Sequence, residues 1–266
     1  MIGYASCLVI SVFFNSFTPQ IYCPLFDYAT FLLHLRPQLS IAMIKVEIDS
    51  RITDTCPEMA IGLVRATVVN GSTSDELWAE IETAAQEVKT RYELLAINQR
   101  PAIAGTRHLY KSLGKDPSRY RVASEALCRR IVKGQGIYRL TTLIDVVNLV
   151  SIKSGYPISG LDADKIAGDT LTMGVGRHEE PYNGIGRGLL NIEGMPVYRD
   201  ALGPVATPTS DEERTKFNDE TVAAQICINA FAPEMPIDDA TAWMAELLEK
   251  YACATRIETN VIKWKY

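Results

Sequence analysis

The chain has 266 residues, of which 47% are hydrophobic and 22% charged, and a formal net charge of −5 at pH 7. This length suits one large domain or two small ones and can bury a substantial core. The negative charge excludes a general attraction to nucleic acid or anionic lipid, although a local patch can differ from the average. The six cysteines include no C-x-x-C pair. We therefore predict no metal site and no cofactor, and we expect free thiols in a reducing cytoplasm.

The first 42 residues differ from the rest in composition. They contain no lysine, and Asp27 and Arg36 are their only charged residues. The apolar run 4–14 is shorter than the ~20 residues that cross a bilayer, and it lacks the basic start of a secretory signal. We interpret residues 1–42 as an extension outside the fold, with an export signal as the alternative. Residues 43–266 are then the domain, with no membrane partner.

From Met43 onward the sequence shows the periodicity of regular elements. Thr73 and Glu76 have capping-box spacing before a long amphipathic helix. Gly114, Gly134 and Gly155 stand where later helices would end. We predict helices over 105–113, 124–133 with Ser124 as the cap, 141–154 and 238–253. We predict strands over 44–48, 60–69, 169–174, 195–199, 224–231 and 256–264. Without a regular βαβ repeat, this order predicts an α+β fold with a mixed sheet flanked by helices.

The segment DVVNLVSIKSGYPISGLD, residues 145–162, is the most informative stretch. Asn148 places an amide inside an apolar helical run, and Ser159 follows in a turn-rich segment. A buried amide needs hydrogen-bond partners, so Asn148 either ties neighbouring backbone together or faces a pocket. The residues alone leave both interpretations open.

This segment resembles a family motif. Asp-x-x-Asn, followed by a small-Gly-x-Pro turn that ends in Asp, is similar to the motif of the B3/B4 domain. That domain edits aminoacyl-tRNA in the phenylalanyl-tRNA synthetase beta chain and also occurs as free-standing proteins. The blocks 107–134 and 168–215 resemble the free-standing members in order and spacing. The resemblance covers about residues 43–266 and implies a B3/B4-like fold.

The resemblance also implies a pocket. Asn148 and Ser159 match its catalytic positions, and its other positions form the substrate-binding set Val147, Thr207, Thr209, Ser210, Asp211, Cys227 and Asn229. The sequence departs from the synthetase pattern where serine replaces a histidine, valine a threonine, and cysteine or asparagine a glutamate. An aminoacyl ester is already activated, so its hydrolysis needs mainly an oriented water and oxyanion donors. We therefore expect any hydrolysis to be slow and driven by positioning.

A basic segment interrupts the acidic chain. Residues 107–139 carry nine basic side chains against Asp116 and Glu125, a local excess of +7. Interleaved tyrosines offer stacking surfaces, and such a patch suits phosphate contacts. The alternative is a solvated helical face with internal ion pairs. We predict RNA-binding residues Arg107, Tyr110, Lys111, Arg129 and Arg130.

Three weaker signals have structural interpretations. Residues 183–188, NGIGRG, lack the spacing and context of a dinucleotide-binding loop and indicate a turn. Asp162 is better explained as a helix cap than as a cation ligand. His178, beside two glutamates, is typical of a solvated loop.

Three hypotheses about function follow. The leading one is a cytoplasmic, free-standing protein that binds tRNA or aminoacyl-tRNA and hydrolyses a mischarged ester in trans, with no ligase activity of its own. The alternative is a non-catalytic module that binds an amino acid or small metabolite. The third is an accessory RNA-binding protein without a pocket ligand.

Overall fold

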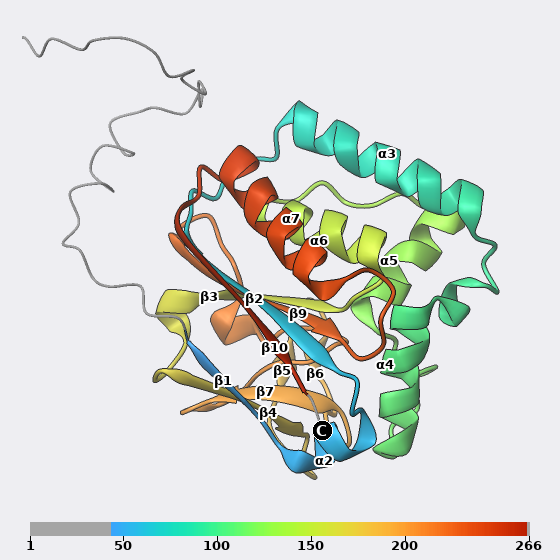
Figure 1. The fold of residues 1–266 in the computed structure, drawn as a ribbon, viewed down its shortest axis with the longest axis vertical. Coiled ribbons are helices and arrows are strands. Elements are labelled where there is room, and N and C mark those ends of the chain that lie inside the picture. Colours follow the sequence, from blue (N-terminus) through green and yellow to red (C-terminus); the bar gives the residue numbers. More distant parts are fainter. Residues whose placement is uncertain (1–43, 265–266) are drawn as a thin grey trace, which may run out of the picture. The chain divides into compact units, whose positions relative to one another are not determined.

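The structure is a computed structural model, and it describes residues 44–264. The prediction for residues 1–42 therefore concerns residues outside this range. Two four-stranded sheets, which we name sheet A and sheet B, lie one against the other (Figure 1). Helices α3 (Asp75–Arg91), α5 (Ala123–Val132), α6 (Thr142–Ser154) and α7 (Ile237–Tyr251) cover the face of sheet B that points away from sheet A. This arrangement is α+β, as the sequence predicts.

Sheet B is the middle layer, and its strand order is β10-β2-β9-β3, with every neighbouring pair antiparallel. Its strands are β2 (Ala60–Thr67), β3 (Ile158–Asp162), β9 (Ala223–Ala230) and β10 (Thr255–Lys263). Successive side chains of a strand point to opposite faces. On β9, Ile226 and Ile228 therefore join the core under the helices, whereas Cys227 joins the core between the two sheets.

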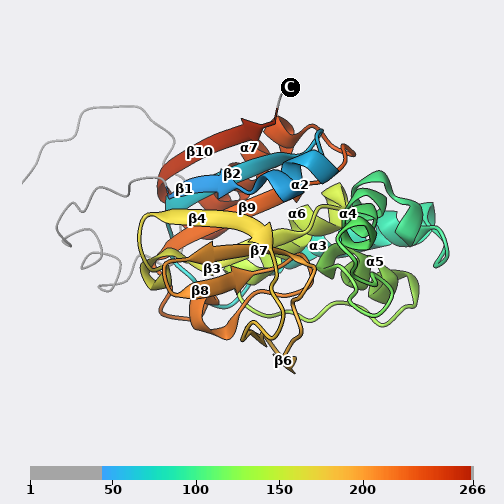
Figure 2. The ribbon, with the colours of Figure 1, turned by 90° about the horizontal axis from the view of Figure 1, so that it is seen from below.

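Sheet A is mixed, and its strand order is β1-β4-β7-β8 (Figure 2). Its strands are β1 (Lys45–Ile48), β4 (Thr170–Val175), β7 (Pro196–Asp200) and β8 (Gly203–Ala206). The pair β1–β4 is parallel, and the other pairs are antiparallel. Leu171 and Met173 of β4 are buried against sheet B. The alternate residues of β4, which include Thr172, point to the outer face.

The remaining elements are short. They are α2 (Ser50–Thr55), α4 (Pro101–Ser112), the 3-10 helices η1 (Ile97–Gln99), η2 (Ala163–Lys165) and η3 (Glu213–Thr215), and the hairpin of β5 (Asn183–Gly184) and β6 (Gly188–Leu189). The hairpin confirms the predicted turn over 183–188. No helix within residues 44–264 is long and apolar enough to cross a membrane.

Gly155 ends α6 as predicted, in the left-handed conformation with φ +74°. A Cβ at this position would lie 2.8 Å from Glu234 Oε2, so the site also excludes larger residues sterically. Arg100 closes the same corner: its Nη1 donates to Ile152 O at 2.9 Å and its Nη2 to Lys153 O at 3.0 Å. Its Nε donates to Glu234 Oε1 at 2.8 Å. These hydrogen bonds of the buried Arg100 side chain fix the point at which the chain leaves α6 and enters β3.

Two predicted helix caps are wrong. Ser74, not Thr73, caps α3 and accepts from Leu77 N at 3.2 Å. Thr73 instead donates to Asp145 Oδ2 of α6 at 2.5 Å, so its hydroxyl joins the segment before α3 to α6. Ser124 lies inside α5, which begins at Ala123, and its buried hydroxyl has no partner within the described residues. The first amide of α5, Ala123 N, donates to Pro208 O at 2.9 Å.

The described cysteines follow the prediction in part. Cys56, Cys128 and Cys227 are buried free thiols. Cys253 differs, because it is disulfide-bonded.

Candidate functional site between the sheets

One face of β9 is polar although it is fully buried. Gln225, Cys227 and Asn229 alternate with apolar residues, and each is no more than 1% exposed. They therefore point together into the space between the sheets. Ser159 of β3 lies directly opposite Cys227 in the antiparallel register, which places its side chain on the same face. We name these four residues, together with Tyr198 and Asp211, the intersheet cluster.

Tyr198 of β7 connects the two sheets within this cluster. Its hydroxyl donates to Asn229 Oδ1 at 2.7 Å, and Asn229 Nδ2 donates to Pro157 O at 3.1 Å. The Asn229 amide thus accepts with its oxygen and donates with its nitrogen, and so joins β7 to the start of β3. Burial raises the pKa of Tyr198 well above its usual value, so this hydroxyl stays protonated and remains a donor.

The turn 207–211 closes the cluster on one side. Thr207 Oγ1 donates to Ser210 O at 2.9 Å and accepts from Ser210 N at 3.1 Å. Two buried tyrosines hold the turn from outside: Tyr110 OH lies 2.9 Å from Thr209 Oγ1, and Tyr182 OH donates to Ser210 O at 2.6 Å. The predicted loop residues therefore form one rigid turn.

Asp211 ends this turn and supplies the carboxylate of the cluster. Its Oδ2 accepts from Gly160 N at 3.0 Å, and the Ser159 hydroxyl lies beside it. Burial raises the pKa of Asp211 to about 7, although both partners favour the charged form. The cluster offers no cation to offset the lost hydration.

Asp211 differs from the other ionisable members of the cluster. Burial raises the pKa of Cys227 to about 12, so its thiol is not a nucleophile at neutral pH. Within this cluster only Asp211 changes charge near pH 7. As a whole residue Asp211 is half-buried, whereas Ser159 is 2% exposed and Asn229 1%.

Asn148 and Val147 are not part of this cluster. Val147 packs against the core under the helices, on the other side of sheet B from Cys227. Asn148 is half-buried and lies beside the carboxylate of Asp145. Burial raises the pKa of Asp145, and the Asn148 amide acts in the opposite direction. Their sequence-based grouping with Ser159 in one pocket is therefore wrong, because the strand face that carries Ser159 points away from α6.

Part of the basic segment is engaged in internal ion pairs. Glu125 is 2% exposed and collects three guanidinium groups, from Arg107 at 2.9 Å, Arg121 at 3.6 Å and Arg129 at 3.9 Å. Tyr110 is fully buried and cannot stack on a base, so its prediction as an RNA-binding residue is wrong. Arg107 and Arg129 are held mainly by Glu125 and by backbone carbonyls.

A smaller basic surface remains accessible. Arg130 lies over the ring of Tyr138, with its guanidinium carbon 4.5 Å from the ring centroid, and Tyr138 is 65% exposed. Lys133 is exposed nearby in sequence, and Lys111 is exposed near the end of α4. We name Arg130, Lys133 and Tyr138 the basic face.

The weaker signals take their structural roles. Asp162 caps η2 by accepting from Asp164 N at 3.2 Å. His178 is an exposed loop residue beside Glu193, at 3.1 Å. No group of three or more histidine, cysteine, aspartate or glutamate residues in the described part of the chain is placed to hold a metal ion.

Sequence reasoning missed Gln225, Tyr198 and Tyr182. The pattern AQICINA over 224–230 contains a signal for Gln225, because a buried strand that places a polar residue at every second position must gather them on one face. Nothing local identifies the two tyrosines, whose partners lie 28 or more positions away in the sequence.

Comparisons with known proteins identify a family for this chain. No curated protein matches the chain. One solved structure that the chain matches is an N-terminal fragment of the phenylalanyl-tRNA synthetase beta subunit from Pyrococcus horikoshii, with a TM-score of 0.43 and 13% identity. The match covers 81% of this chain and 50% of that fragment, so the chain spans about half of the fragment's length. The family model described as B3/4 domain matches residues 105–243, which is more than half of the chain and includes β3, the turn 207–211 and β9. The chain therefore belongs to the B3/4 domain family.

Proposed function

We propose that this B3/4 protein binds the aminoacyl end of a tRNA and hydrolyses a mischarged ester in trans. The observation that carries the proposal is Asp211, a carboxylate with a pKa of about 7 that lies beside the Ser159 hydroxyl inside a polar cluster. A general base works best when its pKa lies near the working pH, because it is then both available and sufficiently basic.

The proposed step uses Asp211 and one water molecule. The carboxylate takes a proton from the water while the water oxygen adds to the carbonyl carbon of the ester. The bond between that carbon and the ribose oxygen then breaks, and Asp211 returns the proton to the departing oxygen. Ser159 is not basic at neutral pH, but its hydroxyl beside Asp211 can hold the water in place.

The direct test is a deacylation screen over a panel of misacylated tRNAs with the purified full chain. We expect release of the amino acid from at least one tRNA above the rate without protein. Ser159→Ala should retain part of this activity, because it removes only a positioning contact. Absence of release across the complete panel would reject the proposal.

The basic face provides a second prediction. Arg130→Ala with Lys133→Ala should weaken tRNA binding and lower the slope of log affinity against log salt by roughly one unit per lost phosphate contact. The measurement is a filter-binding titration at several salt concentrations. The matched control is Lys89→Ala with Arg91→Ala, which removes two exposed charges near the end of α3.

Arg107→Ala should behave differently from the Arg130/Lys133 variant of the basic face. It removes the shortest ion pair of buried Glu125, so the melting temperature should fall.

Unchanged tRNA affinity in the Arg130/Lys133 variant would exclude the basic face as an RNA contact.

A non-catalytic module for an amino acid or small metabolite is the second candidate. One observation favours it: Asn229 and Tyr198 already satisfy each other, which leaves few free donors for an oxyanion. Saturable binding of a free amino acid, without turnover of any misacylated tRNA, would select this candidate.

A further inference from the structure

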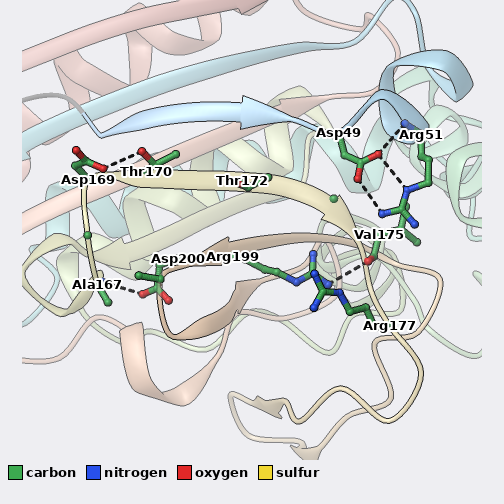
Figure 3. Close-up of a pocket in the computed structure, with 13 residues that line it drawn as sticks. Asp49, Arg51, Ala167, Asp169, Thr170, Thr172, Val175, Arg177, Arg199 and Asp200 are labelled. Atoms are coloured by element: carbon green, nitrogen blue, oxygen red, sulfur yellow. Dashed lines mark hydrogen bonds and ion pairs between the residues drawn. The ribbon is translucent and has the colours of Figure 1, made fainter.

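A separate cavity of about 410 Å³ lies on the outer face of sheet A, away from the intersheet cluster. Thr172 and Gly174 of β4 belong to its lining, on the face opposite buried Leu171 and Met173. Figure 3 shows that the cavity has two unlike ends. Its arginines, Arg51, Arg177 and Arg199, gather at one end, and Asp169 and Asp200 lie at the other.

Two of the three arginines are paired within the protein. Arg51 contacts Asp49 through Nε at 3.0 Å and Nη2 at 2.8 Å, and these bonds lower the pKa of Asp49 to about 2. Arg199 contacts Glu180 through Nε at 2.7 Å and Nη2 at 2.5 Å. The Arg199 pair is mostly buried, with side chains 15% and 10% exposed, whereas the Arg51 side chain is 63% exposed.

Arg177 is the unpaired member. It is exposed, and its guanidinium forms no ion pair or hydrogen bond with any residue in 44–264. Arg177 and Arg199 both belong to the lining of the cavity. Among residues 44–264, Asp49 and Glu180 are the carboxylates that form ion pairs with these three cations, which leaves an excess of about one positive charge at this end.

Gly174 lines this end of the cavity and places no side chain in it. A Cβ there would lie 3.3 Å from Arg199 Nη1 and 3.7 Å from Asp49 Oδ2. A larger side chain would fill the space between these two groups. The glycine thus leaves room for a ligand group to approach them.

We propose that this cavity binds a small phosphate monoester, with the phosphate at the end formed by Arg51, Arg177 and Arg199. Guanidinium groups match phosphate oxygens with parallel hydrogen bonds, and the unpaired Arg177 supplies the charge that a phosphate would neutralise. The volume lies within the ~300–1,000 Å³ of small-ligand sites.

The far end of the cavity suits a ligand whose part beyond the phosphate carries hydroxyl or amino donors. Asp169 is exposed, and among residues 44–264 its carboxylate accepts a hydrogen bond only from the neighbouring Thr170 hydroxyl, at 2.9 Å. Asp200 is not available, because it binds Arg214 at 2.9 and 3.0 Å. A sugar phosphate or a nucleotide combines a phosphate with such donors. This site is independent of the proposed esterase step.

Calorimetric titration of the full chain tests this site, with ribose 5-phosphate and AMP as ligands and ribose as the uncharged control. We expect both phosphate esters to bind and ribose not to bind. Arg177→Ala should weaken binding roughly tenfold, the scale for loss of one charge-assisted hydrogen bond. The matched control Arg91→Ala removes another exposed arginine and should leave affinity unchanged.

Several outcomes would overturn the proposal. One is no binding of either ester at millimolar concentration, and another is equal affinity in Arg177→Ala and the unchanged protein. If Arg177→Ala instead lowers affinity for tRNA while neither ester binds, the cavity contacts an RNA backbone and the small-ligand proposal is wrong. Deacylation activity is measured separately, so its absence does not affect this test.

Discussion

Replacing Asp211 with asparagine is expected to stabilise the protein at pH 8. The folded pKa of Asp211 is about 7 against an ordinary value of 3.8, so the folded state holds a proton that the unfolded state releases. The stability contributed by that proton is complete below about pH 4 and is lost as pH rises through 7. Asparagine mimics the uncharged form at every pH. The free energy of unfolding of the variant should therefore exceed that of the unchanged protein by about 2–4 kcal/mol at pH 8.

Urea unfolding at pH 4, 6 and 8 measures this difference. Other groups also contribute to the pH dependence, and burial raises the pKa of Asp145 as well, but these contributions cancel between the two proteins. The gap should be small at pH 4 and largest at pH 8. A variant that is less stable at pH 8, or a gap that does not grow with pH, would show that Asp211 is ionised in the folded protein at neutral pH.

Replacing Arg100 with alanine should cost about 3–5 kcal/mol, the scale for breaking a buried ion pair by removing one partner. The Arg100 side chain is 2% exposed and that of Glu234 15%. The change also removes two bonds to the last carbonyls of α6 and loosens the entry into β3. Urea unfolding at pH 7 gives the free energy of unfolding.

The control for Arg100 is an exposed pair in the same helical layer. Lys153 contacts Glu87, and their side chains are 34% and 54% exposed. Lys153→Ala should cost less than about 1 kcal/mol, because solvent screens such pairs. If Arg100→Ala cost no more than this control, the corner at Gly155 would be held by packing alone.

The sequence predicts local features of this fold well. The end of α6 at Gly155 and the strand β9 follow from periodicity and from a residue that tolerates positive φ. The family motif over 145–162 also leads to the correct fold class. These signals are local, so one stretch of sequence contains all the information they need.

Other features depend on partners far away in the sequence. The segment 155–162 reads as a turn, yet 158–162 form strand β3, because β9 supplies hydrogen bonds that no local pattern shows. The count of basic residues over 107–139 cannot reveal that three of them surround one buried glutamate, Glu125.

The candidate site is predictable only in part. Ser159, Asp211 and Asn229 come together as the resemblance implies, because β3, β9 and the turn 207–211 converge between the sheets. Asn148 does not, since the side on which a helix lies depends on sheet order rather than on distance along the chain. The perturbed pKa of Asp211 follows from burial and cannot be read from the sequence.

The pH profile of deacylation tests the central claim most directly. The rate on the most responsive misacylated tRNA is measured from pH 5.5 to 8.5 with the unchanged protein and with Asp211→Asn, and the rate without protein is subtracted. We predict that the protein-dependent rate rises through about pH 7 as Asp211 loses its proton, and that the variant loses it while remaining folded. A variant that retains the rate and the same pH profile would contradict the assignment of Asp211 as the base.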